Sequence, residues 1–259
     1  MNFPEEYPCL MLNGLHDIMS ERDLDEMIAH AKELTLEELK GIYSDVAFAV
    51  EKIKARLNDN SYAQSIKIYV DEYNRIILKG DDDRKNKLSN YALIEGNNVY
   101  CCAGNANGDG HVNEFLNSTD GFIPNFKYHV ENATYIIDGL GRVCDTYEHH
   151  VTERMTNRFD RSKVETEKLK NYREGDVGGH IVAYSIDGVS ESINIVPMSS
   201  RFNQSGDWKS MEGIIEGAYK NHIPVSVHKH FVYLGDSFRP SNIEVSIALK
   251  ERLIQFQCP

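Results

Sequence analysis

The chain has 259 residues, with 28 basic and 40 acidic side chains and a formal net charge of −12. This length suffices for one large domain or two modest ones, and the composition excludes collagen, coiled coils and wholesale disorder. No apolar stretch approaches the roughly 20 residues of a membrane helix, so no membrane span is expected.

No secretory signal is expected in the first residues. Met1–Asp17 carries Glu5 and Glu6 where a signal peptide has basic residues before an apolar run. We therefore expect the protein to be cytoplasmic when made. Any export would need a non-classical or specialised secretion route.

The next part of the chain predicts helices. Ser20 and Thr35 each precede an acidic first turn, as capping residues do, and apolar residues follow both at helical spacing. The apolar stripe after Thr35 continues to Asn58 and predicts a single helix. A third helix is predicted over Ser61–Leu78, with its apolar residues on one face.

A change in composition then divides the chain. A polar, glycine-bearing linker begins at about residue 79, and the boundary is placed at residue 122. Residues 1–122 hold 12 basic and 22 acidic side chains, and residues 123–259 hold 16 and 18. The first part is interpreted as an acidic, mainly helical region of unknown role. The second is nearly neutral, so it can form a local basic groove despite the acidic total.

The second half predicts an α+β domain. Thr134–Val143 is typical of two strands joined by a glycine turn. An amphipathic helix with Trp208 in its buried face should end near Asn221 and Pro224. No internal repeat is predicted. Further strands are predicted at His180–Ser185, Ser192–Val196, Val225–Leu234 and Ile243–Leu249.

Cysteine and histidine spacing gives no strong metal signature. The five cysteines are odd in number and scattered, which favours mostly reduced thiols over a zinc site or disulfide scaffold. His228 and His230 would share one face of a strand, as metal ligands can. We interpret them as solvated side chains.

Three motifs in the second half carry chemistry. Each alone has an ordinary structural interpretation, since a glycine pair usually forms a turn and a lone histidine is usually structural. The motifs are Gly175-Asp176-Val177-Gly178-Gly179-His180, then Asn194-Ile195-Val196-Pro197, then the segment from Phe202 to Glu212.

In this order, the motifs resemble the DNA/RNA non-specific endonuclease family. This family is a branch of the His-Me finger, or ββα-metal, nucleases, and the match is to its Asp-x-Gly-Gly-His subgroup. The resemblance covers the second half of the chain and none of the first. It extends to the hairpin Asp138-x-x-Gly141-Arg142 and to Ser237–Ser241.

The resemblance implies a ββα-metal fold with an antiparallel sheet, and hydrolysis of phosphodiester bonds. In the family, the histidine matching His180 is the general base and the asparagine matching Asn203 holds a magnesium ion. A neutral imidazole can accept a proton from water near neutral pH. Mg²⁺ keeps several of its waters, so one amide ligand and a substrate phosphate suffice, and Mn²⁺ is a second candidate.

The residues before His180 are expected to shape the site. Gly178 and Gly179 would let the backbone turn sharply and let a phosphate approach without a Cβ in the way. Asp176 would either orient the imidazole of His180 or cap the turn. These two roles of Asp176 stay open.

Two further positions match the family motifs. Glu212 is expected to reach a metal-bound water, as the matching glutamate does in relatives, provided that Gly206 delays entry into the helix. Asn194 is expected to pin the loop around the site, with a direct role at the metal as the alternative.

The sequence departs from the better-known form of the family in one respect. An arginine usually stands between the aspartate and the glycine, and here Val177 and Gly178 occupy that stretch. Another cation must then face the scissile phosphate. Arg239 is the first candidate, with Arg201 and Lys209 behind it.

The sequence therefore predicts a metal-dependent endonuclease that cuts DNA, with RNA as a second substrate and little sequence preference. Nucleases of this subgroup often form the C-terminal part of bacterial toxins, which are neutralised by an immunity or inhibitor protein. The alternative is a catalytically inactive, nuclease-like binding module that acts through a protein partner of its helical half. The missing arginine favours this alternative, and the retained His180, Asn203 and Glu212 disfavour it.

Overall fold

The computed structural model describes residues 15–57, 66–80, 87–103, 116, 122–150, 170–186, 188–189, 191–249 and 252–258. Within these residues, eleven strands form one sheet in the order β1-β2-β3-β4-β5-β6-β7-β8-β11-β12-β13, and β9 pairs with β10 in a separate hairpin. All neighbouring strands are antiparallel except β5 and β6, which are parallel. The fold is therefore mixed α and β, with a large, mainly antiparallel sheet.

The part of the chain before residue 104 contains helices and strands. In chain order its elements are α1 (Leu15–Ile18), α2 (Glu21–Ala29), β1 (Lys32–Leu34), α3 (Leu36–Ile42), α4 (Ser44–Leu57), β2 (Ile66–Val70), β3 (Ile76–Gly80), the 3-10 helix η2 (Lys87–Asn90), β4 (Tyr91–Glu95) and β5 (Asn98–Cys101).

The second part contains the longest strands and the helices α5 and α6. Its elements are β6 (Lys127–Val130), β7 (Ala133–Ile137), β8 (Val143–His150), β9 (Asp176–His180), the 3-10 helices η5 (Tyr184–Ile186) and η6 (Ser192–Asn194), β10 (Ile195–Ser199), α5 (Ser200–Ser205), α6 (Asp207–Lys220), β11 (Val225–Val232), β12 (Asn242–Leu249) and β13 (Arg252–Cys258).

The predicted helix starts at Ser20 and Thr35 are confirmed. Each cap hydroxyl accepts a hydrogen bond from the backbone N–H three residues later. The acidic side chain at that later position accepts a hydrogen bond from the backbone N–H of the cap residue. The single helix predicted after Thr35 is wrong in one respect, because the chain leaves the helix at Tyr43 and starts again as α4. The capping residues therefore predicted the helix starts correctly, whereas the apolar pattern did not show the break between α3 and α4.

The helix predicted over Ser61–Leu78 is wrong where the structure describes it. Residues 66–70 and 76–80 form the antiparallel hairpin β2–β3, which lies between β1 and β4. The isoleucines and the valine of this segment favour strands, and both strands pair with neighbouring strands. The helical spacing of the apolar residues was therefore a coincidence. Residues 61–65 lie outside the described residues.

The segment predicted as a polar linker also contains the buried strands β4 and β5.

Two hairpins of the sheet have the same kind of turn. In the β2–β3 turn, Asp71 Oδ1 accepts from the backbone N–H of Tyr73 and Arg75, and Arg75 Nε donates to Asp71 Oδ2 at 2.7 Å. In the β7–β8 turn, Asp138 makes the same three bonds, with Leu140 and Arg142 as donors. The two turn sequences share only an aspartate and an arginine four positions apart.

Among the predicted strands of the second half, the β7–β8 hairpin, β11 and β12 are confirmed. The strand predicted at His180–Ser185 is wrong, because His180 ends β9 and the chain then enters η5. The strand predicted at Ser192–Val196 begins later, after η6. Glycine-containing β9 was missed because glycine ordinarily weakens a strand.

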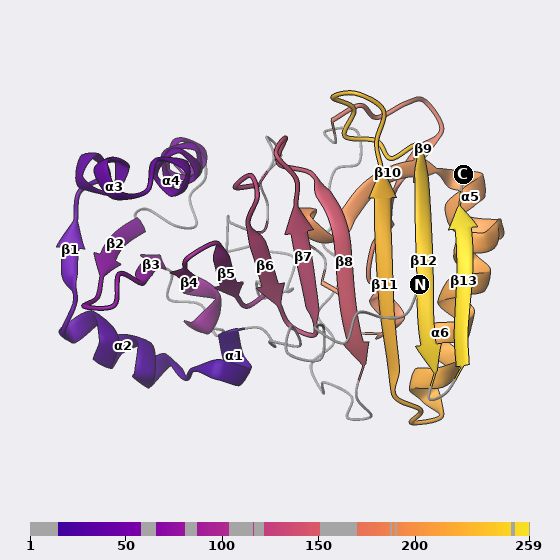
Figure 1. The fold of residues 1–259 in the computed structure, drawn as a ribbon, viewed down its shortest axis with the longest axis horizontal. Helices are drawn as coiled ribbons and strands as arrows, with labels where there is room; N and C mark the ends of the chain where they lie inside the picture. The colour runs from indigo at the N-terminus through magenta and orange to yellow at the C-terminus, as the bar shows by residue number, and fades with distance from the viewer. Residues whose placement is uncertain are drawn as a thin grey trace.

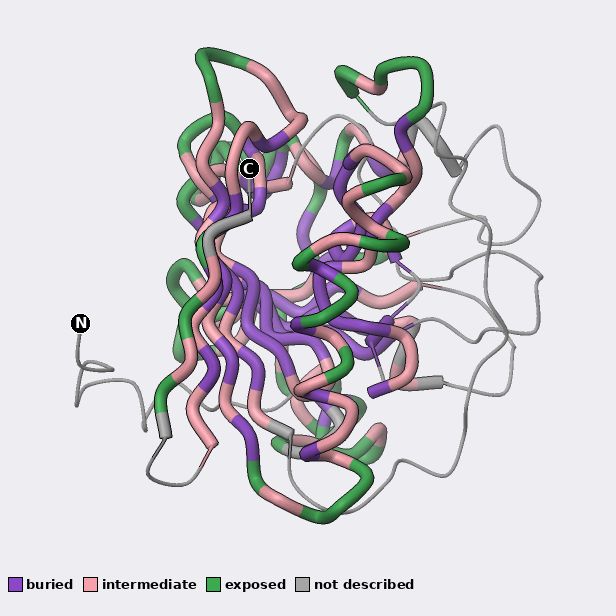
Figure 2. The backbone as a smooth tube through the Cα atoms, turned by 90° about the vertical axis from the view of Figure 1, so that its right-hand side faces the viewer, coloured by how far each residue is buried: buried purple, intermediate pink, exposed green. Residues whose placement is uncertain are grey.

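The main hydrophobic core extends along the sheet, and a second, smaller core cluster includes Leu15, Leu24 and Ile77. Figure 1 shows α5 and α6 behind β11–β13 and the helices α1–α4 around β1–β5. The Trp208 side chain is fully buried, as predicted, and packs with Phe202 between the helices and the sheet. Figure 2 shows the buried residues gathered in the strands, with exposed residues mainly at turns and outer helix surfaces. None of the described helices has the length and apolar character to cross a membrane.

The sheet and the core continue across the predicted boundary at residue 122. Strand β5 pairs with β6, and the main core cluster includes buried residues from both sides, such as Val99 and Tyr128. The division of the chain into residues 1–122 and 123–259 stays a prediction.

Candidate active site

Strands β9 and β10 and helix α5 form a compact ββα unit. In the hairpin, His180 stands opposite Ile195 and Asp176 opposite Ser199. Helix α5 follows β10 directly, with Ser199 as its cap, and contacts both strands. The unit therefore brings the strand that ends in His180 together with the helix that carries Asn203.

The glycines before His180 lie inside a strand, which corrects the expected sharp turn. Because side chains alternate along a strand, Asp176, Gly178 and His180 share one face of β9. Gly179 faces the other way, where an added Cβ would lie 2.2 Å from Met198 Cε and 2.3 Å from its sulfur. Gly179 thus makes room for Met198, and Gly178 leaves the face beside His180 without a side chain.

Asp176 pairs with Arg239 and caps a turn. Arg239 Nε donates to Asp176 Oδ2 at 2.8 Å and Nη2 donates to Oδ1 at 3.0 Å, while the Arg173 backbone N–H donates to Oδ2. Asp176 and His180 are four positions apart in the strand, about 13 Å along the chain, so the carboxylate does not orient that imidazole directly. Of the two roles left open by the sequence, the structure favours the cap.

The surroundings of Asp176 change its acidity. Burial alone would raise the pKa of this carboxyl, but the hydrogen bonds from Arg239 and from the Arg173 backbone outweigh burial and lower the pKa. The pKa of Arg239 is raised, chiefly by its hydrogen bond to Asp176. Both groups therefore stay charged at neutral pH, and the pair is a charge-assisted, bidentate contact.

Asn194 holds the loop after β9 in place. Its Oδ1 accepts from the Tyr135 hydroxyl at 3.0 Å and from the Val182 N–H at 2.7 Å, and its Nδ2 donates to the carbonyls of Val182 and Val189. The side chain is fully buried. All its hydrogen-bonding capacity is thus used by the fold, so its candidate role as a metal ligand is corrected and the expected loop-pinning role is supported.

Asn203 differs from Asn194 in its surroundings. It lies in α5, is half-buried, and its amide makes no hydrogen bond with any described residue. Within the described part of the chain, no group of three or more His, Cys, Asp and Glu side chains converges as metal ligands. A single amide oxygen such as that of Asn203 suits a cation such as Mg²⁺, which keeps most of its waters.

Glu212 and Asn203 lie on separate helices. Gly206 divides α5 from α6, and an added Cβ there would lie 3.2 Å from the Phe202 carbonyl oxygen. This break is the delayed helix entry that the sequence suggested. Glu212 is mostly buried and pairs with Lys209, whose Nζ lies 3.2 Å from Oε2. The charge of Lys209 is therefore partly neutralised by its own helix.

The remaining predicted cation is Arg201 on α5. Its side chain is exposed and makes no ion pair with a described residue. Arg239 keeps three of its five N–H donors beyond the pair with Asp176. The two arginines therefore remain available to a phosphate, whereas Lys209 is engaged.

His228 and His230 share one carboxylate on the open face of the sheet. His228 Nε2 lies 2.8 Å and His230 Nδ1 lies 2.9 Å from the same oxygen of Asp145. Burial would raise the pKa of Asp145, but its hydrogen bonds to both histidines outweigh burial and lower it. The histidines are thus partnered rather than simply solvated.

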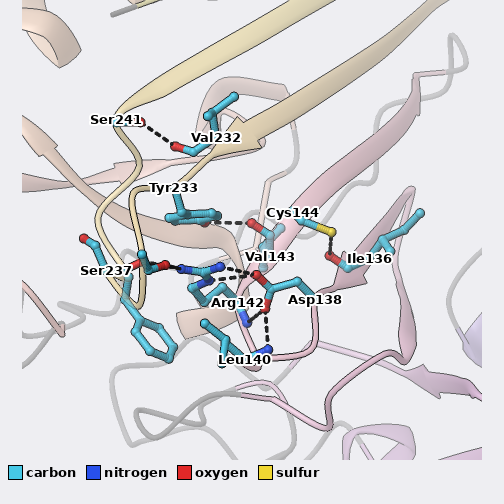
Figure 3. Close-up of polar contacts among 12 residues, drawn as sticks. Ile136, Asp138, Leu140, Arg142, Val143, Cys144, Val232, Tyr233, Ser237 and Ser241 are labelled. Carbon is cyan, nitrogen blue, oxygen red and sulfur yellow. Dashed lines mark hydrogen bonds and ion pairs between the residues drawn. The ribbon is translucent and has the colours of Figure 1, made fainter.

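Sequence reasoning missed the residues that join these motifs. Tyr135 is buried and reaches Asn194 from β7, and Arg142 donates from its hairpin to the loop after β11 (Figure 3). An aspartate and an arginine four residues apart at a hairpin turn are the signal that could have found Arg142. No local signal identifies its loop partners.

The β9–β10 hairpin followed by α5 has the arrangement of a ββα-metal fold. Residues 124–251 match the family model described as DNA/RNA non-specific endonuclease. The chain therefore carries a domain of this family, and it is a hydrolytic nuclease that acts on phosphodiester bonds.

Several solved nucleases are similar in structure at low sequence identity. NucA from Streptococcus agalactiae with magnesium bound has 15% identity and a TM-score of 0.40, covering 49% of this chain and 69% of that one. Sda1 nuclease with bound zinc has 14% identity and a TM-score of 0.37, covering 49% and 72%. EndoG in complex with EndoGI has 15% identity and a TM-score of 0.37, covering 49% and 71%. The family assignment rests on the match over residues 124–251.

Proposed function

We propose that the protein is a metal-dependent endonuclease that cuts DNA, and RNA as a second substrate, with His180 as general base and Asn203 as the protein ligand of Mg²⁺. The observation that carries the proposal is the ββα unit, in which α5 packs on the strand ending in His180 and the Asn203 amide makes no hydrogen bond with a described residue. Mn²⁺ is the second metal candidate.

In this mechanism the side chains have separate tasks. The His180 imidazole takes a proton from the attacking water. Arg239 and Arg201 supply positive charge to the phosphate oxygens, which need it most in the transition state. A bound Mg²⁺ supplies further neutralisation of that charge and stabilises the leaving alkoxide. Glu212 would accept a hydrogen bond from a water of the bound ion.

The low sequence preference follows from the kind of groups involved. Donors that contact phosphate fix the position of a nucleic acid but read no base edges. Gly178 adds to this by leaving the backbone beside His180 open to a phosphate. We therefore expect cutting at many positions of a plasmid.

A plasmid-cutting assay with Mg²⁺ tests the proposal. The wild type should cut, EDTA should abolish cutting, and His180→Ala should lower the rate by about 10²- to 10⁴-fold, the usual contribution of a general base. His30→Ala is the matched control, because His30 caps the end of α2 at the surface and should leave the rate unchanged. An absence of metal-dependent cutting by the wild type would instead support the inactive binding module.

We also propose a role as a toxin or effector, made in the cytoplasm and exported by a specialised route. The family resemblance supports this role, which implies an immunity or inhibitor protein as partner. Inducible expression should then arrest growth, and His180→Ala should relieve the arrest. Normal growth with active wild-type nuclease in the cell would contradict the toxin role and leave the nuclease activity intact.

A further inference from the structure

Arg142 connects two parts of the second half that lie far apart in sequence. Its Nε donates to Asp138 within the hairpin turn, and its Nη1 donates to the carbonyls of Gly235 at 2.7 Å and Ser237 at 2.9 Å (Figure 3). The guanidinium also lies 4.4 Å from the centre of the Tyr233 ring. The hairpin thus fixes the loop between β11 and β12.

The same loop carries Arg239. Ser237, whose carbonyl accepts from Arg142, uses its hydroxyl to accept from the Arg239 N–H and to donate to the Arg239 carbonyl, both at 3.0 Å. The position of Arg239 along the loop is therefore set by the residue that Arg142 holds. Nearby, the Phe238 N–H donates to Asn171, which restrains the loop from the other side.

Arg239 then reaches the ββα unit through Asp176. Asp176 is the first residue of β9 and stands opposite Ser199, whose hydroxyl caps α5. In addition, the Ser200 N–H donates to the Gly175 carbonyl at 3.1 Å. The Arg239–Asp176 pair is therefore attached to the place where the helix carrying Asn203 begins.

The hairpin at Asp71–Arg75 provides a comparison within the same chain. Arg75 makes the same Nε bond to its aspartate at 2.7 Å, and both turns have a residue of positive φ before the arginine, Asn74 and Gly141. Arg75 makes no hydrogen bond to a second loop within the described residues. Closing the turn therefore requires only the aspartate pair, and the loop contacts of Arg142 serve something else.

We propose that Arg142 is a positioning residue for the nuclease reaction, holding the loop of residues 233–241 so that Arg239 is fixed against Asp176 at the start of the ββα unit. Arg142 touches no reacting atom and acts through Arg239. This inference rests on the nuclease function proposed above. It gives the Asp-x-x-Gly-Arg hairpin a role in catalysis beyond forming a turn.

Kinetics of Arg142→Ala and Arg75→Ala test the proposal. Arg142→Ala should lower kcat on plasmid DNA by about tenfold to a hundredfold, because small displacements of positioned groups reduce rates by that order. KM should change much less. Arg75→Ala should leave both constants unchanged. Arg142→Lys should have a kcat between those of Arg142→Ala and the wild type. A lysine can donate to one of the loop carbonyls but cannot also keep the other contacts of the guanidinium. Equal losses in both alanine variants would overturn the proposal.

A stability cycle tests the contact chain without any activity. Asp176→Asn should lower the urea midpoint in the wild type and in Arg75→Ala, but clearly less in Arg142→Ala, because the pair is already weakened there. Where Arg142→Ala does not fold, Ser237→Ala replaces it, since it removes the hydroxyl contacts to Arg239. Equal effects of Asp176→Asn in all backgrounds would overturn the proposal.

The two failures can be distinguished. A wild type that never cuts nucleic acid removes the proposed function and this role with it. A wild type that cuts normally, together with a cutting rate of Arg142→Ala equal to that of Arg75→Ala, removes only the role of Arg142.

Discussion

At the residue scale, the Asp176–Arg239 pair predicts how stability depends on pH. The pKa of Asp176 is lower in the folded protein than in the unfolded chain, where it is about 3.9. Its stabilisation is therefore complete above about pH 4 and is lost as the pH falls through the folded pKa. Asp176→Asn should lower the free energy of unfolding by about 2 kcal/mol at pH 7, the order expected for hydrogen bonds to a charged group.

Urea unfolding of the wild type and Asp176→Asn from pH 7 to pH 2 checks this expectation. The difference between the two proteins should be constant down to about pH 5 and shrink below about pH 4. A difference that persists at pH 2 would show that the carboxylate charge is not what stabilises this contact.

Cys144 leads to a second prediction at this scale. Burial, with nearby Asp145 adding to it, raises the pKa of its thiol to about 12. Thiolate is the reactive form, so at pH 8 only about one molecule in ten thousand is reactive, against roughly a quarter for a free cysteine. Cys144 should react with iodoacetamide far more slowly in the native protein than in urea, as peptide mapping can measure. Equal rates would contradict the raised pKa.

At the element scale, glycines in β9 and α6 should respond oppositely to alanine. Gly179→Ala places a Cβ against the Met198 side chain, and the forced repacking should cost about 1 to 3 kcal/mol. Gly213 lies in the exposed face of α6 with nothing within 4 Å of an added Cβ, so Gly213→Ala should stabilise by about 0.5 to 1 kcal/mol. Thermal midpoints measure both, and a neutral Gly179→Ala would mean that β9 and Met198 are loosely packed.

The same scale shows what the sequence can predict. The capping boxes at Ser20 and Thr35 were predictable because all their partners lie within four residues. The strands at 66–70 and 76–80 could not be predicted in this way. Their local sequence is compatible with a helix or a strand, and their pairing with β1 and β4 decides between the two. In the site, the motif suggested His180 and Asn203 as candidates, and their roles stay predictions. The partner of Asp176 lies 63 residues away and has no local signal.

At the scale of the whole molecule, one sheet joins the acidic first part to the nuclease domain. β5 and β6 pair in parallel, and His129 stacks on Tyr100 with ring centres 4.7 Å apart. The Glu131 carboxylate accepts from the Ala103 N–H at 2.8 Å. Composition could not reveal this joint, because it is made by two short, mostly buried strands, β5 and β6, whose pairing depends on the fold.

This continuity predicts that residues 123–259 do not form a stable domain alone. Removing residues 1–122 exposes the edge of β6 and the buried side chains of Tyr128 and Val130, which stand beside Val99 and Cys101 in the sheet. Each large buried side chain contributes about 1.5 to 3 kcal/mol, and typical domains have only about 5 to 15 kcal/mol in total. An unpaired edge strand also promotes aggregation. The fragment should therefore unfold at much lower urea than the full chain, or aggregate, whereas cooperative unfolding at the same midpoint would establish two independent domains divided near residue 122.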